Sequence, residues 1–189
     1  MVLTSIIIGL GITHLLSGVG AAIDRISTSG SRFQLRPTHG CWAGFVFVWL
    51  ISFWWWQFRL LGLVSTWTMG RYLFIVLYAV LLFLLVVIVI PRDWESVTNL
   101  DEYFLAKRHW FFSAFLLGNV IDVVDSYLKG GWEYVAATGP FAVGLVIVTI
   151  PVFVIGIRSK NLRVHTPMAV IMLIWQVLVS FNAFPQLKL

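Results

Sequence analysis

Charged residues are scarce in this sequence, and long polar stretches are lacking. Lys, Arg, Asp and Glu make up 11% of the 189 residues, whereas 60% are hydrophobic and the mean hydropathy is +0.93. A soluble domain carries about 25% charged residues. The composition therefore excludes an ordinary soluble protein and predicts a membrane protein. No hydrophilic stretch is long enough for a second domain, so residues 1–189 are expected to form a single transmembrane domain.

Cysteines and enzyme motifs are also lacking. Cys41 is the only cysteine, which excludes an intramolecular disulfide and a cysteine metal cluster. The sequence has no glycine-rich nucleotide motif, no Glu-x-x-His pattern and no defensible Ser-His-Asp arrangement. An enzyme is therefore the least supported class, and no cofactor is predicted.

Acidic residues are fewer than basic ones, at 8 against 13. In a membrane protein such an excess sets the orientation in the bilayer, so we do not interpret it as nucleic-acid binding. Six spans would place both termini on one side, and nine of the 13 basic residues then fall in loops on the other side. The positive-inside rule predicts non-cytoplasmic termini, in a cell membrane that we expect to be a bacterial inner membrane.

Apolar windows of about 20 residues predict an all-α, polytopic bundle of about six transmembrane helices joined by short loops. The third span has no charge from Tyr72 onwards, so we expect it to be the most lipid-exposed helix. The expected spans are Val2–Ala22, Cys41–Leu61, Arg71–Ile90, His109–Leu128, Thr138–Ile157 and Pro167–Phe184.

The longest loop covers residues 91–108. Asn99 followed by Glu102 resembles a capping box and predicts that a helix begins near Leu100. Tyr103 and the basic pair at 107–108 suit an interfacial helix that runs into the fourth span. The mixed charges are most simply a solvated face; the alternative is a docking surface for a protein partner.

The fourth span carries most of the polar groups. Asn119, Asp122 and Ser126 share one helical face, and Asp125 lies toward its edge. A charge at the centre of a spanning helix costs about 2.5–3.5 kcal/mol, whereas each large apolar residue returns only about 0.3–0.6 kcal/mol. This helix would insert marginally alone, so partner helices are expected to cover its polar face.

Intramembrane polar residues mark ion or proton paths by default. His14, Asn119 and Gln176 are expected near the midplane, Asp122 one turn toward the outside and Asp125 at the outer rim. Together they could relay protons or bind a cation. Alternatively, these side chains only join helices by hydrogen bonds worth about 0.6 kcal/mol each.

Tryptophans crowd the end of the second span. Trp54, Trp55, Trp56 and Arg59 are expected to anchor this helix at the membrane interface. The alternative is an aromatic cage for a lipid, a quinone or a cationic ligand.

Three histidines, His39, His109 and His165, occur at the expected cytoplasmic starts of alternate spans. They could converge on one metal ion, although none forms a close pair of the H-E-x-x-H kind. Only His14 is deep, so one protomer offers no pair of histidines for a membrane haem.

Two functional hypotheses follow. The first is a small homo-oligomeric channel or transporter that conducts protons or a cation past Asp122, Asn119 and His14. The second is a non-transporting membrane protein, such as an accessory subunit, a sensor or a bundle that binds a lipid, quinone or haem. In the second case the buried polar residues only pack helices.

Overall fold

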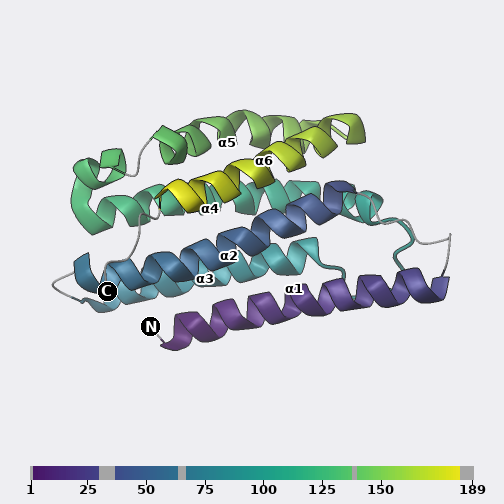
Figure 1. Cartoon of the computed structure of the whole chain (residues 1–189), viewed down its shortest axis with the longest axis horizontal. Helices are drawn as coiled ribbons and strands as arrows, with labels where there is room; N and C mark the ends of the chain where they lie inside the picture. Colours follow the sequence, from purple (N-terminus) through teal and green to yellow (C-terminus); the bar gives the residue numbers. More distant parts are fainter. Residues whose placement is uncertain (1, 30–36, 64–66, 138–139, 184–189) are drawn as a thin grey trace.

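The computed structural model describes residues 2–29, 37–63, 67–137 and 140–183. Almost all of these residues are helical, so the predicted all-α bundle is confirmed. The first residues of the first helix and the last of the sixth lie at the same end of the bundle, here called the terminus end (Figure 1). The opposite end is called the loop end. The helices are α1 (Val2–Ser29), α2 (Pro37–Leu63), α3 (Met69–Val89), α4 (Leu100–Ala137), α5 (Pro140–Arg158) and α6 (Leu162–Ala183).

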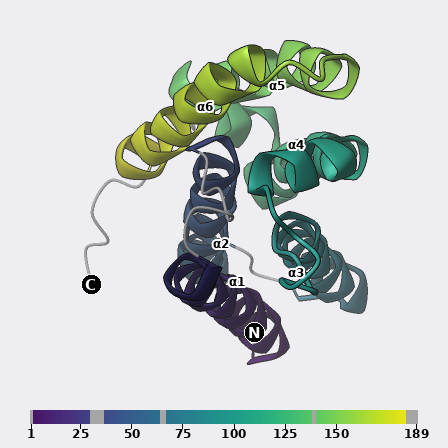
Figure 2. The ribbon, with the colours of Figure 1, turned by 90° about the vertical axis from the view of Figure 1, so that its right-hand side faces the viewer.

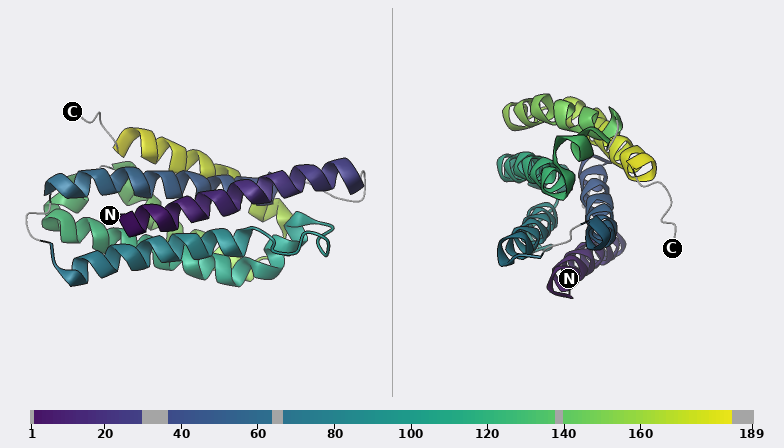
Figure 3. Two further views of the ribbon diagram at one scale, coloured as in Figure 1. Left: turned by 90° about the horizontal axis from the view of Figure 1, so that it is seen from below. Right: turned by 90° about the vertical axis from the view of Figure 1, so that its left-hand side faces the viewer.

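The helices form three layers of two, which are clearest when the bundle is seen end-on (Figure 2). α1 and α3 make one outer layer, α5 and α6 make the other, and α2 and α4 lie between them. Figure 3 shows the same order from the other end. The closest packing joins α2 to α6 and α1 to α3. The polar fourth helix is thus a central one, covered by α3, α5 and α2.

Four helices in the described residues are long and apolar enough to cross a membrane, and this is fewer than the six expected. They are Val2–Thr28, Met69–Val89, Leu100–Leu128 and Leu162–Phe181. The second expected span is rich in tryptophan, whose amphipathic ring contributes less apolarity than an aliphatic side chain. In α5 only Ile147–Arg158 qualifies, as a shorter apolar helix. The chain thus has the features of a multi-pass membrane protein.

The expectation that the third span is the most lipid-exposed is wrong. In α3, 39% of the most apolar window is buried, against 22% in α1. α3 packs against α1, α4 and α2, whereas α1 lies at a corner of the bundle. Hydropathy measures the free energy of transfer of a helix into an apolar medium. A protein interior and a lipid bilayer are both such media, so hydropathy cannot tell which of them a helix contacts.

Asn99 caps α4 as the sequence predicts. Its Oδ1 accepts hydrogen bonds from the backbone N–H groups of Asp101 at 3.0 Å and Glu102 at 3.4 Å. The expected interfacial helix is therefore the first part of α4 itself, continuous with the fourth span. Its charges do not all form a solvated face, because Asp101 is only 2% exposed and Arg108 only 9%.

At the loop end, side chains from the first turns of α4 form hydrogen bonds with backbone groups at the ends of neighbouring helices. The carboxylate of Asp101 accepts from the His39 N–H and from the Thr38 hydroxyl, both at 3.2 Å, and so caps the start of α2. The Tyr103 hydroxyl donates to the carbonyl of Ile88 at 3.1 Å. Arg108 Nε donates to the carbonyl of Ile157 near the end of α5 at 3.1 Å. Helix ends leave orphan backbone groups, which are expensive near a bilayer.

Aromatic rings fill the space between the two central helices. Trp42 of α2 is fully buried, and its ring centroid lies 5.0 Å from that of Phe111 and 5.3 Å from that of Phe112. Phe104, about two helical turns before Phe111, stacks on Trp42, and Phe115, about one turn after it, meets Trp42 edge-on. Stacked and edge-on contacts are both favoured aromatic geometries, and they fix the register of α2 against α4.

Candidate functional site

The polar groups of α4 near the terminus end lie inside the bundle. Asn119, Asp125 and Ser126 are buried, with 5%, 2% and 7% of their surface exposed, and Asp122 is half-buried. Their spacing places them on one side of the helix, and α2 and α3 pack there. The sequence-based expectation that neighbouring helices cover this face agrees with this packing.

A chain of hydrogen bonds connects three helices at Asp122. The hydroxyl of Tyr78 in α3 donates to Asp122 Oδ1 at 2.8 Å. Trp49 Nε1 in α2 donates to the same hydroxyl at 3.2 Å. Asp125 also lies close enough to interact electrostatically with Tyr78. Trp49 thus orients the hydroxyl of Tyr78, and Tyr78 in turn holds the carboxylate of Asp122.

Gly118 makes room for this chain. A Cβ atom at Gly118 would come within 2.6 Å of the Trp49 ring, closer than real side chains approach. The absence of a side chain at Gly118 lets the Trp49 ring approach α4 closely, with its N–H directed at Tyr78. Gly118 is therefore a positioning residue for the hydrogen bonds around Asp122.

Three other residues predicted for an ion path, Asn119, His14 and Gln176, form no hydrogen bond with Asp122 in the described part of the chain. Asn119 donates within its own helix, to the Phe115 carbonyl at 2.9 Å. His14 is partly buried on α1, and its Nε2 has no hydrogen-bond partner there. Gln176 is buried on α6, where its backbone carbonyl accepts a hydrogen bond from the Ser180 hydroxyl.

Sequence reasoning missed two residues of this region. Tyr78 lies in the most apolar span, where an aromatic residue is unremarkable and its hydroxyl gives no signal. Gln57, which follows the tryptophans of α2, is only 7% exposed, and neither atom of its side-chain amide has a hydrogen-bond partner in the described part of the chain. It lies two turns beyond Trp49, which suggests that the polar region extends toward the terminus end.

Two of the tryptophans of α2 are exposed near the terminus end. Trp54 and Trp55 are 41% and 38% exposed near the terminus end, and Trp56 is half-buried. The side chain of Arg59 lies outside the described residues. Anchoring at the interface therefore stays a prediction.

The three candidate metal-binding histidines do not come together. His39 Nε2 lies 2.8 Å from the Val89 carbonyl, and His165 Nε2 lies 2.9 Å from the Ser159 carbonyl. His109 is exposed. Among the described residues, no group of three or more His, Cys, Asp and Glu could hold a metal ion. Both buried imidazoles instead satisfy carbonyls at helix ends.

Comparison with protein-family models, curated proteins and solved structures found no match to this chain.

Proposed function

We propose that this protein is a small multi-pass membrane channel or transporter for protons or a monovalent cation, and that Asp122 binds the ion. The contact between Asp122 Oδ1 and the Tyr78 hydroxyl carries the proposal. A carboxyl group within a spanning helix is costly, and such groups mark ion or proton pathways by default.

The position of Asp122 supports this role. It is half-buried, and it lies in the second half of α4, which runs toward the terminus end. The Tyr78 hydroxyl holds one carboxylate oxygen in place, and Trp49 in turn holds this hydroxyl. Asp125, one turn further along α4, adds a second acidic group to the approach.

A second candidate, a non-transporting protein whose polar residues pack helices, is favoured by one observation. The hydrogen-bond chain ends at Trp49, and an indole N–H can only donate. A proton therefore cannot pass along this chain beyond Tyr78. In this second candidate, the hydrogen bonds of Trp49, Tyr78 and Asp122 serve only to connect α2, α3 and α4.

Flux measurements in proteoliposomes separate the two candidates. The protein is reconstituted with an internal pH dye, and proton, Na⁺ and K⁺ gradients are imposed in turn. A protonophore accompanies the Na⁺ and K⁺ gradients, so that compensating proton movement reports the flux of these ions. We expect flux above that of empty liposomes, and we expect Asp122→Asn to lower it at least about tenfold. A tenfold change corresponds to 1.4 kcal/mol, within the range for the loss of a charged ligand.

Asp24→Asn is the matched control, because Asp24 is an exposed acid at the loop end of α1. It should leave flux unchanged. Absence of flux under all three gradients, together with a lower melting temperature for Asp122→Asn, would exclude transport and leave the packing role.

Oligomeric state, partners and membrane are part of the same proposal. We infer a homo-oligomer in a bacterial inner membrane with non-cytoplasmic termini, and a protein partner at residues 91–108. Mass measurement in detergent tests the oligomer, and fusion of a topology reporter to each terminus tests the orientation.

A further inference from the structure

A separate apolar groove lies at the loop end, between α1, α2 and the segment that follows α3. Its volume is about 400 Å³. The hydrogen bond from the Arg25 guanidinium to the Glu95 carbonyl, at 3.1 Å, ties the end of α1 to the segment that carries Trp94 and so holds this wall of the groove in place. The groove does not include any residue of the Asp122 region.

The groove is elongated along the helix axes. Its lining runs from Leu15 to Ile26 on α1 and from His39 to Phe47 on α2. At 1.5 Å per residue, these stretches are about 16 Å and 12 Å long. A groove of this length, parallel to spanning helices, suits one extended hydrocarbon chain.

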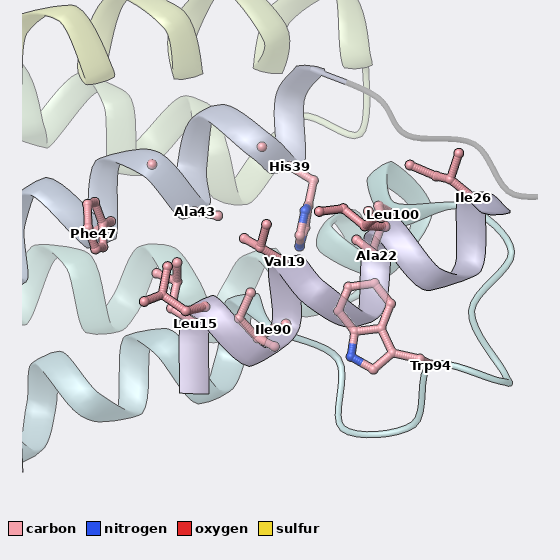
Figure 4. Close-up of a pocket in the computed structure, with 15 residues that line it drawn as sticks. Leu15, Val19, Ala22, Ile26, His39, Ala43, Phe47, Ile90, Trp94 and Leu100 are labelled. Atoms are coloured by element: carbon pink, nitrogen blue, oxygen red, sulfur yellow. The ribbon is translucent and has the colours of Figure 1, made fainter. Parts of the chain in front are cut away.

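His39 supplies a polar atom at one end of this groove. Figure 4 shows its ring projecting from α2 into the space lined by Val19 and Leu100. Nε2 lies 2.8 Å from the Val89 carbonyl, and a carbonyl can only accept, so Nε2 carries the hydrogen. In a neutral imidazole Nδ1 is then an acceptor. In the described part of the chain Nδ1 has no hydrogen-bond partner.

The imidazole is held in this state by its surroundings. His39 is 4% exposed, and burial lowers the pKa of its imidazole, although the Val89 carbonyl and the Asp101 carboxylate act in the other direction. The hydrogen bond of Nε2 to the Val89 carbonyl holds the ring, and the hydrogen bond of the backbone N–H to Asp101 holds the backbone at His39. Apart from the indole N–H of Trp94, the ring of His39 carries the polar side-chain atoms of the lining, and its Nδ1 acceptor selects a ligand with a hydrogen-bond donor.

We propose that this groove binds a long-chain alcohol, with its hydroxyl donating to His39 Nδ1 and its chain lying between Leu15 and Phe47 toward the middle of the bilayer. The hydroxyl matches the acceptor, the chain matches the length and apolarity of the groove, and the head lies at the end of the bundle where a lipid head group would lie. An ordinary phospholipid lacks a donor next to its acyl chains.

Photolabelling in phosphatidylcholine nanodiscs tests the proposal. The probe is hexadecanol with a diazirine on its chain, and the comparison compound is its methyl ether, which has the same chain and no donor. We expect the alcohol to label the peptide that contains Leu15 to Ile26 about fivefold more than the ether, the effect of one hydrogen bond. Equal labelling by the two compounds, or no labelling of this peptide, would overturn the proposal.

Two variants add independent checks. Gly40 lines the groove, and a Cβ there would meet nothing within 4 Å, so Gly40→Leu should fill the space and abolish labelling. A Cβ at Gly9 would also meet nothing within 4 Å, but Gly9 lies outside the groove, so Gly9→Leu should leave the labelling unchanged. His39→Phe keeps an apolar ring and removes the acceptor. In this variant the alcohol should label the protein no more than the ether does. If the alcohol still labels it more than the ether, the assignment of Nδ1 as the acceptor is contradicted.

Discussion

Tyr78 in the most apolar helix donates its hydroxyl hydrogen to Asp122 Oδ1, 44 residues away in the chain, at a distance of 2.8 Å. The contact pairs a polar group of α3 with the acid of α4 on the inner faces of both helices. It shows one way in which α4 accommodates an acidic residue, because a neighbouring helix supplies a hydrogen-bond donor to Asp122.

Removing the Tyr78 hydroxyl should weaken the bundle. Tyr78→Phe leaves both Asp122 Oδ1 and Trp49 Nε1 without this partner, and we expect a loss of about 1 kcal/mol, typical of one hydrogen bond within a membrane bundle. Thermal unfolding in detergent measures it. Tyr127→Phe is the control, since Tyr127 is 46% exposed, and an equal effect of the two substitutions would argue against the pairing.

Gly118→Ala should displace Trp49 from its place on α4. The added methyl group would come within 2.6 Å of the indole, and overpacking of this kind costs about 1–3 kcal/mol. The tryptophan emission spectrum and the melting temperature should both change. In the control Gly9→Ala the new methyl group meets nothing within 4 Å, and neither quantity should change.

The cap of α2 should depend on Asp101. Asp101→Ala leaves the His39 N–H without this acceptor, and a buried unsatisfied group costs about 1–3 kcal/mol. The Thr38 hydroxyl keeps its hydrogen bond with Thr166. We expect faster hydrogen exchange in the first turn of α2. Asp24→Ala removes an exposed acid from α1, and exchange in α2 should stay as in the unmodified protein.

Acid should destabilise the bundle through His39, which precedes the apolar part of α2. Burial lowers its pKa in the folded state, so the unfolded chain binds the proton more readily. The stability due to neutral His39 is therefore complete above the unfolded value of about 6.5 and declines as the pH falls below it. Melting temperatures between pH 7.5 and 5 measure this decline. His39→Gln should show a smaller one, and an unchanged slope in this variant would assign the effect to other groups.

The sequence alone determined the properties that follow from short-range order and from transfer free energy. The scarcity of charge and the long apolar windows determined a helical membrane bundle. The Asn99 cap and the shared face of Asn119 and Asp122 follow from helical periodicity, which acts within a few residues. None of these features depends on which helix lies next to which.

Only the tertiary structure decided the partners. In the sequence Tyr78 looks like one more apolar residue, and its role follows only from the packing of α3 against α4. Asp101 looks like a surface charge, and its role follows only from its contact with the start of α2. His39 and His165 have metal-ligand chemistry, but the carbonyl ends of nearby helices take their Nε2 atoms instead. The physical reason is that hydrogen bonds and burial depend on distances between segments remote in the chain, whereas hydropathy cannot distinguish contact with lipid from contact with another helix.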